Sequence, residues 1–158
     1  MKHCCGHGRI IACLAIVLVA GCSGEDKAQG PDLSKLVPVS GIATLDDTPV
    51  ADANVTFVPK SKDGFVATGR TDASGKYEVA TDDGKGKMTK GVVPGDYNVV
   101  VTKFTGVDGK PIKLDPKVAP MNQGAVQGLP FRYSGVGEMG LSFTVPPGGG
   151  TYDIKMEK

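Results

Sequence analysis

The residue best placed for chemistry is Cys22, a thiol that follows a run of apolar and then small residues. Eleven apolar residues run from Ile10 to Ala20, and Gly21 stands directly before the cysteine. A helix of that length rises only about 16 Å, roughly half of a hydrocarbon core of ~30 Å. The only charged side chains that precede the run are two basic ones. The segment is therefore predicted to be an export signal, because it is too short to span a membrane.

The order Val19-Ala20-Gly21-Cys22 resembles the lipobox of bacterial lipoproteins. In that family the signal is cut before the cysteine, whose thiol receives a diacylglycerol and whose new amino group is usually acylated. The resemblance implies a signal peptide over residues 1–21, cleavage between Gly21 and Cys22, and covalent lipid on Cys22 without any other cofactor. The alternatives are an ordinary signal peptide or an uncleaved anchor, in which Cys22 would be incidental.

Removal of residues 1–21 changes which reactions the remaining side chains can support. The remaining cysteines and both histidines lie in the removed segment: Cys4, Cys5, Cys13, His3 and His7. Triads based on imidazole or thiolate are therefore excluded for the mature chain. Sixteen basic and seventeen acidic residues remain, a formal charge of −1. That balance excludes the strongly basic field of a nucleic-acid-binding protein.

Two pairs of adjacent carboxylates, Asp46-Asp47 and Asp82-Asp83, are the remaining candidates for acid–base chemistry. Neighbouring side chains on an extended chain point to opposite sides, and both pairs lie in sequence typical of turns. We therefore expect solvated turns, no metal site and no enzymatic activity. Calcium is the alternative for such acidic turns, because hard cations accept carboxylates and loop carbonyls.

A long segment without a clear strand pattern, Thr105 to Gly128, is the best candidate for recognition. Its 24 residues hold three lysines that alternate with apolar residues, and three prolines that exclude a helix. Uncovered loops of that length are uncommon in compact domains. The segment is predicted to be an extended edge or a recognition loop for a protein or a glycan. A variable insertion without a partner is the alternative, and the absence of tryptophan argues against a strong sugar-stacking platform.

Residues 22–36 are predicted to be the lipidated cysteine and a flexible tether. The segment is polar, contains Gly24, Gly30 and Pro31, and has no periodic apolar face. Ser23 stands where well-studied enteric lipoproteins that stay at the inner membrane carry an aspartate. By that resemblance, the outer membrane is favoured over the inner membrane.

Residues 37–158 carry the alternating pattern of short strands separated by turns. Seven strands are predicted, at residues 39–45, 53–58, 65–71, 76–81, 97–104, 141–145 and 151–156. The strand 97–104 is apolar on both faces and is expected to be central, while 82–91 is expected to be a polar loop. Seven strands without a convincing helix predict an all-β domain, a single seven-stranded Ig-like or prealbumin-like β-sandwich.

Two local features of this domain have a structural interpretation. Asp72 and Gly75 suit a tight turn in which the aspartate bonds nearby amides and the glycine takes a positive φ. Tyr97 follows a Pro-Gly turn, and we expect its ring to be buried and its hydroxyl to bond the backbone, as in tyrosine corners.

The order of four motifs carries a second resemblance. They are Val39-Ser40-Gly41, Ala53-Asn54-Val55-Thr56-Phe57, Thr71-Asp72-Ala73-Ser74-Gly75-Lys76-Tyr77 and Pro94-Gly95-Asp96-Tyr97. In this order they resemble the carboxypeptidase regulatory-like domain, a transthyretin-like sandwich, over residues 38–104. The resemblance implies an accessory or structural module with no catalytic residue to transfer, and it implies neither proteolysis nor hormone binding.

The sequence as a whole predicts a lipoprotein of the bacterial cell envelope. It is expected to bind the membrane through lipid on Cys22 and to carry one β-sandwich over residues 37–158. The expected role is structural or protein-binding, with an envelope protein or a glycan as partner and no nucleic acid. The alternative is a ligand-binding module for glycan or calcium that acts through the acidic turns or residues 105–128.

Overall fold

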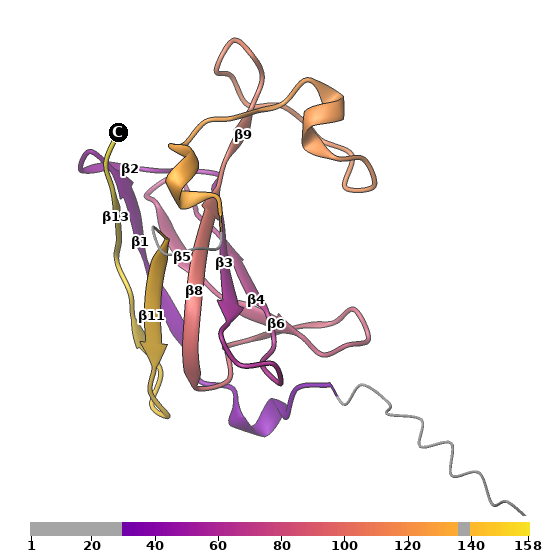
Figure 1. Ribbon diagram of the computed structural model, residues 1–158, viewed down its shortest axis with the longest axis vertical. Coiled ribbons are helices and arrows are strands. Elements are labelled where there is room, and N and C mark those ends of the chain that lie inside the picture. Colours follow the sequence, from indigo (N-terminus) through magenta and orange to yellow (C-terminus); the bar gives the residue numbers. More distant parts are fainter. Residues whose placement is uncertain (1–29, 136–139) are drawn as a thin grey trace, which may run out of the picture.

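The computed structural model describes residues 30–135 and 140–158, and these two ranges fold into β-sheets without an α-helix (Figure 1). Their only helical pieces are three short 3-10 turns: η1 (Leu33–Lys35), η2 (Pro120–Gln123) and η3 (Phe131–Tyr133). None of the helices in the described ranges has the length and apolar character needed to span a membrane. The predicted all-β class is confirmed, whereas the predicted signal peptide and Cys22 lie outside the described residues.

One sheet of five strands is organised around β1 (Val39–Leu45). β1 pairs in parallel with β12 (Gly150–Thr151) and β13 (Ile154–Met156). It pairs antiparallel with β2 (Thr48–Pro49) and β5 (Lys76–Glu78). The first strand predicted from the alternating pattern therefore occupies the middle of this sheet.

The other large sheet has six antiparallel strands in the order β11-β8-β3-β4-β6-β7. Their bounds are β11 (Leu141–Val145), β8 (Gly95–Thr102), β3 (Asn54–Pro59), β4 (Ala67–Arg70), β6 (Ala80–Asp82) and β7 (Met88–Lys90). β8 lies between β11 and β3, as its apolar composition predicted. A small third sheet pairs β9 (Phe104–Thr105) with β10 (Val126–Gln127).

The core lies between the two large sheets, and both contribute side chains to it. Phe57 on β3 is fully buried, and its ring centroid lies 5.9 Å from that of Tyr97 and 6.3 Å from that of Phe143. The buried residues of this core run from Val39 to Met156. Residues 30–158 therefore contain the complete core that the structure describes, in an arrangement like a β-sandwich.

The predicted strand 76–81 is wrong as a single element, because the chain changes sheets within it. β5 pairs with β1 in one sheet, while β6 pairs with β4 in the other. Val79 is the crossing point, and its N–H donates to the carbonyl oxygen of Val39 at 3.1 Å. Tyr77, Val79 and Thr81 are all buried. The inward alternation continues across the crossing since both sheets face the same core, so the pattern gives no sign of the break.

The predicted polar loop 82–91 is also corrected, because it contains β7, which pairs with β6 as a hairpin. β7 is an edge strand with no buried residue. A strand without a buried face has no apolar alternation to reveal it.

The last predicted strand, 151–156, is interrupted between β12 and β13. At the interruption, the carboxylate of Asp153 accepts the backbone N–H of Ile42 at 3.0 Å, and Tyr152 N–H donates to the carbonyl oxygen of Ser40 at 2.8 Å. The Asp153 carboxylate thus replaces a backbone carbonyl as the acceptor of one hydrogen bond from β1.

The C-terminal part of the predicted tether has regular structure where it is described. Pro31 is buried, and Asp32 caps η1 by accepting the backbone N–H of Ser34 at 3.1 Å. Val37 then exchanges two backbone hydrogen bonds with Val92, at 2.9 and 3.0 Å. The chain is therefore attached to the sandwich before β1 begins.

Candidate functional site

Residues 105–128, predicted as a recognition loop, form together with Phe104 an arm that stands beyond one end of the two large sheets (Figure 1). The arm leaves along β9 and returns along β10, so its base is a two-stranded ribbon. At that base, Gly128 N–H donates to the carbonyl oxygen of Lys103 at 2.7 Å. The side-chain oxygen of Gln127 accepts the backbone N–H of Lys103 at 2.8 Å. Polar contacts therefore fix how the arm joins the end of β8.

Gln123 holds the outer part of the arm together. Its amide nitrogen donates to the carbonyl oxygens of Asp115 and Val118 at 3.0 and 2.8 Å, and its oxygen accepts Asp115 N–H at 2.7 Å. The adjacent η2 turn ends at Gly124, whose φ of 74° lies in the left-handed region. The arm thus has a defined shape, although no residue of it belongs to the core between the sheets.

Large apolar side chains are exposed on and beside the arm. Val107 and Met121 are 84% and 71% exposed, and Phe131, three residues beyond the arm, is 84% exposed. Elsewhere in the described ranges the most exposed large apolar side chain is Met88, at 49%. Burial of such a side chain is worth about 1.5–3 kcal/mol, so a partner that covers several of them gains substantial free energy. These are the three most exposed large apolar side chains of the described ranges, and all three lie within residues 104–131.

The segment after the arm is tied to the C-terminal residues. Arg132 on η3 donates to the carbonyl oxygens of Glu157 and Lys158, and its guanidinium carbon lies 4.9 Å from the centroid of the Tyr133 ring. Tyr133 is buried, and its hydroxyl oxygen accepts the backbone N–H of Glu157 at 3.0 Å. These contacts hold the return of the arm against the end of β13.

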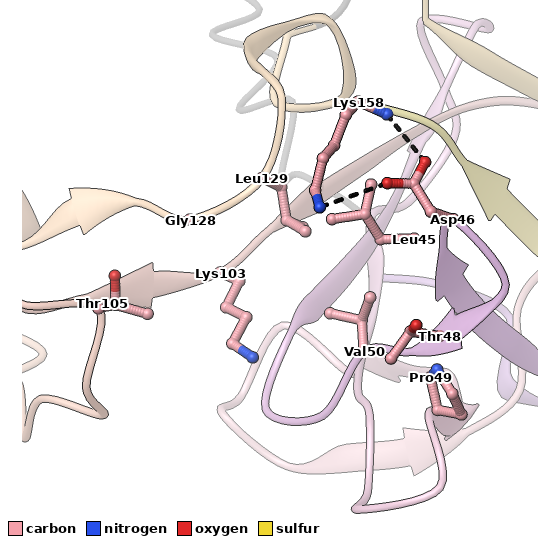
Figure 2. A pocket seen from close by; sticks show the side chains of 11 residues that line it. Leu45, Asp46, Thr48, Pro49, Val50, Lys103, Thr105, Gly128, Leu129 and Lys158 are labelled. Carbon is pink, nitrogen blue, oxygen red and sulfur yellow. Dashed lines mark hydrogen bonds and ion pairs between the residues drawn. The ribbon is translucent and has the colours of Figure 1, made fainter.

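A cleft of about 390 Å³ opens beside the base of the arm (Figure 2). Its apolar wall comes from the end of β1, the segment after the β1–β2 turn and the segment after the arm: Leu45, Pro49, Val50 and Leu129. Lys103 reaches it from the end of β8, and Thr48 and Thr105 add hydroxyl groups. Asp46 and Lys158 stand at the upper side in Figure 2, where their charged atoms lie 3.5 Å apart. The cleft is thus apolar with both charges and hydroxyls at its edges.

The acidic turn at Asp82 and Asp83 is closed by its own backbone amides. Asp82 accepts N–H groups of Gly84 and Gly86 at 2.8 and 3.2 Å, and Asp83 accepts those of Lys85 and Lys87 at 2.7 and 3.1 Å. The pKa of Asp83 is lowered, mainly by the hydrogen bond from the backbone amide of Lys85 and next by that from Lys87. These carboxylates therefore act as turn-forming acceptors.

The turn from Asp72 to Gly75 has the predicted form. Asp72 accepts the hydroxyl of Ser74 at 2.7 Å and the N–H groups of Ser74 and Lys76 at 2.8 and 3.0 Å, and Gly75 has φ 76°. The pKa of Asp72 lies below its ordinary value because of the Ser74 hydroxyl first, and then the two amides.

Within the described ranges, no three His, Cys, Asp or Glu side chains are grouped so as to hold a metal ion.

Asp46 lies in a turn, as predicted, but its carboxylate bonds a distant part of the chain. Asp46 and Asp47 both have positive φ, 47° and 60°, as the two central residues of a tight β1–β2 hairpin require. The Asp46 carboxylate instead accepts the backbone N–H of Lys158 at 3.2 Å. Its partner is 112 residues away in sequence, which no local pattern reveals.

The structure describes one of the three other residues with a predicted role, Tyr97, and does not describe Gly21 and Cys22. The ring of Tyr97 is buried and its hydroxyl donates to the carbonyl oxygen of Val93 at 2.6 Å, so the predicted tyrosine-corner contact is confirmed. Burial raises the pKa of Tyr97. Gly21 and Cys22 lie outside the described residues, and their role stays a prediction.

Compared with known protein families, curated proteins and solved structures, this chain gives no match.

Proposed function

We propose that this chain is a bacterial envelope lipoprotein, acylated on Cys22, whose non-catalytic β-sandwich presents the arm to another envelope protein. The observation that carries the proposal is the exposure of three large apolar side chains on the arm or just after it: Val107, Met121 and Phe131. The lipid anchor rests on the resemblance of Val19-Ala20-Gly21-Cys22 to a lipobox.

The positions of the two ends of the sandwich support this arrangement. In Figure 1, η1 lies at the lower end of the sheets and the arm at the upper end. Gly30, the first described residue, follows Cys22 by only eight positions. A membrane anchor at Cys22 therefore leaves the arm free to meet a partner away from the anchoring bilayer. Two or more acyl chains, at about 0.8 kcal/mol per buried methylene, give stable anchoring.

The proposal includes the finer fold class, a seven-stranded sandwich of the carboxypeptidase regulatory-like, transthyretin-like type. Seven chain segments support it, one of which, β5–β6, crosses from one sheet to the other: β1, β3, β4, β5–β6, β8, β11 and β12–β13. The remaining short strands are hairpin additions, β2 and β7, or the base of the arm, β9 and β10.

The state of the carboxylates favours a protein-binding module over an enzyme or a calcium module. Asp72, Asp82 and Asp83 each accept two or more hydrogen bonds within their own turns. These bonds hold each carboxylate in its own turn, and one such carboxylate supplies only a small part of the six to eight oxygen ligands that calcium takes.

The proposed location is the outer membrane. Ser23, directly after the cysteine, stands where enteric lipoproteins that stay at the inner membrane carry an aspartate.

Photo-crosslinking in intact cells tests the proposed protein contact. A photoreactive amino acid is placed at Val107, Met121 or Phe131 on the arm side, and at Ile42 or Val66 as controls that are 44% and 47% exposed. We expect one shared crosslinked protein from the arm positions and none from the controls. Equal crosslinking from both sets, or no crosslinked protein from the arm, would contradict the proposal.

A further inference from the structure

Lys103 occupies a position where the alternation of β8 calls for a core side chain. Tyr97, Val99 and Val101 alternate along β8 and are buried in the core. Two residues beyond Val101, period two directs Lys103 to the same inner side, and it lines the cleft at the end of the sandwich. Thr105, which continues the alternation, is buried and also lines the cleft. A cationic side chain therefore stands at the mouth of the space between the sheets.

The surroundings of Lys103 leave its charge uncompensated. Figure 2 shows its side chain extending from the end of β8 toward the β1–β2 hairpin, while Lys158 reaches Asp46. Asp46 is the acidic side chain that lines the cleft, and its ion pair is with Lys158. Lys103 takes part in none of the ion pairs between described residues. The side chains that line the cleft thus carry one surplus positive charge.

The floor below this charge is apolar. Val50 and Leu129 are each only 6% exposed, and Leu45 and Pro49 complete the wall. The volume of about 390 Å³ falls within the range of small-molecule sites, which combine apolar walls with a few placed polar groups. An anion with an apolar body matches both features.

We propose that this cleft binds a small organic carboxylate, with its apolar body against Leu45, Val50 and Leu129 and its carboxylate on the Lys103 ammonium. The hydroxyl groups of Thr48 and Thr105 line the same cleft and are available as hydrogen-bond donors. A charge-assisted hydrogen bond to a carboxylate is stronger than a neutral one, which makes Lys103 the residue that selects the charge of the ligand. This site is separate from the exposed side chains of the arm and does not depend on acylation of Cys22.

Octanoate, octan-1-ol and acetate test separately what the charge and the apolar tail of the ligand contribute to binding. The alcohol keeps the tail without the charge, and acetate keeps the charge without the tail. Each is titrated into residues 30–158 by calorimetry, because that part of the chain contains the complete described core. We expect one octanoate per chain, bound at least about tenfold more tightly than either matched probe.

The variant Lys103→Met removes the charge and keeps an apolar stem, and Lys85→Met on the β6–β7 turn is the matched control. Lys103→Met is expected to weaken octanoate binding at least about tenfold and to leave the affinity for octan-1-ol unchanged. Lys85→Met is expected to bind both as the native protein does. The amide signals of Thr48, Lys103 and Leu129 should shift with octanoate in the native protein, a readout that needs no variant.

Three results would overturn the proposal. The first is the absence of saturable octanoate binding, the second is equal octanoate affinity for the native protein and Lys103→Met, and the third is a set of amide shifts away from the cleft. The second result would mean that the ammonium stays in solvent while its stem covers apolar surface, as exposed lysines often do.

Discussion

Replacement of Gln123 by alanine tests whether the arm is a locally stabilised unit. The side chain makes three hydrogen bonds, two to the backbone of Asp115 and one to the carbonyl oxygen of Val118. Each such bond is worth about 0.5–1.5 kcal/mol net, and the lower figure applies at this exposed site. Their loss should lower the free energy of opening this part of the arm by roughly 1.5 kcal/mol, which corresponds to about tenfold faster amide exchange.

Hydrogen exchange followed by NMR gives the local effect, and thermal unfolding gives the global one. The amides of Asp115 and Val118 should exchange about tenfold faster in Gln123→Ala, because these amides lie in the turn that Gln123 closes. The melting temperature should stay within about 2 °C, since the described core contains no arm residue. Asn122→Ala, at the exposed neighbouring position, is the control and should change neither quantity. Unchanged exchange, or a loss of several degrees in melting temperature, would refute this account of the arm.

Three further predictions concern the sandwich that supports the arm. Tyr97→Phe should cost about 1–2 kcal/mol in urea unfolding, because it leaves the Val93 carbonyl without its hydroxyl donor; no measurable loss would contradict it. Gly75→Ala should cost at least about 1 kcal/mol more than Gly84→Ala: both positions have positive φ, but an added Cβ lies 2.6 Å from a β1 carbonyl oxygen only at Gly75. The pKa of Asp72 is lowered in the folded state, so its contribution is present above its unfolded pKa of about 3.9 and lost as pH falls through the folded value. Asp72→Asn should therefore flatten the dependence of the urea midpoint on pH between pH 5 and pH 2, and an unchanged acid slope would contradict this.

Strands with one buried face were predictable because their side chains alternate. The range 39–45 matches β1 at both ends, and β8 has a strand on each side, in line with its apolar composition. The turn at Asp72 and the hydroxyl contact of Tyr97 were predictable as well, since both depend on residues within a few positions. Local patterns thus identified the elements whose contacts are local or whose face is buried.

The remaining features depend on contacts that no local pattern records. Val79 keeps the inward alternation while the chain changes sheets, so the crossing was missed. β7 and the β9–β10 ribbon have no continuous apolar face. The partnership of Asp46 with Lys158 joins distant parts of the sequence. One part of the cleft was predictable from the sequence. The alternation of β8 already directs Lys103 to the inner side, and Lys103 lines the cleft.

The mass of the N-terminal peptide of the mature protein, isolated from membranes of the native host, tests the proposed lipoprotein most directly. The account predicts a peptide that begins at Cys22 and carries a diacylglyceryl group, with or without a further acyl chain on its amino group. A Cys22→Ser variant should lack this modification. A mature chain that begins at another residue, or an unmodified Cys22 in the membrane fraction, would contradict the account.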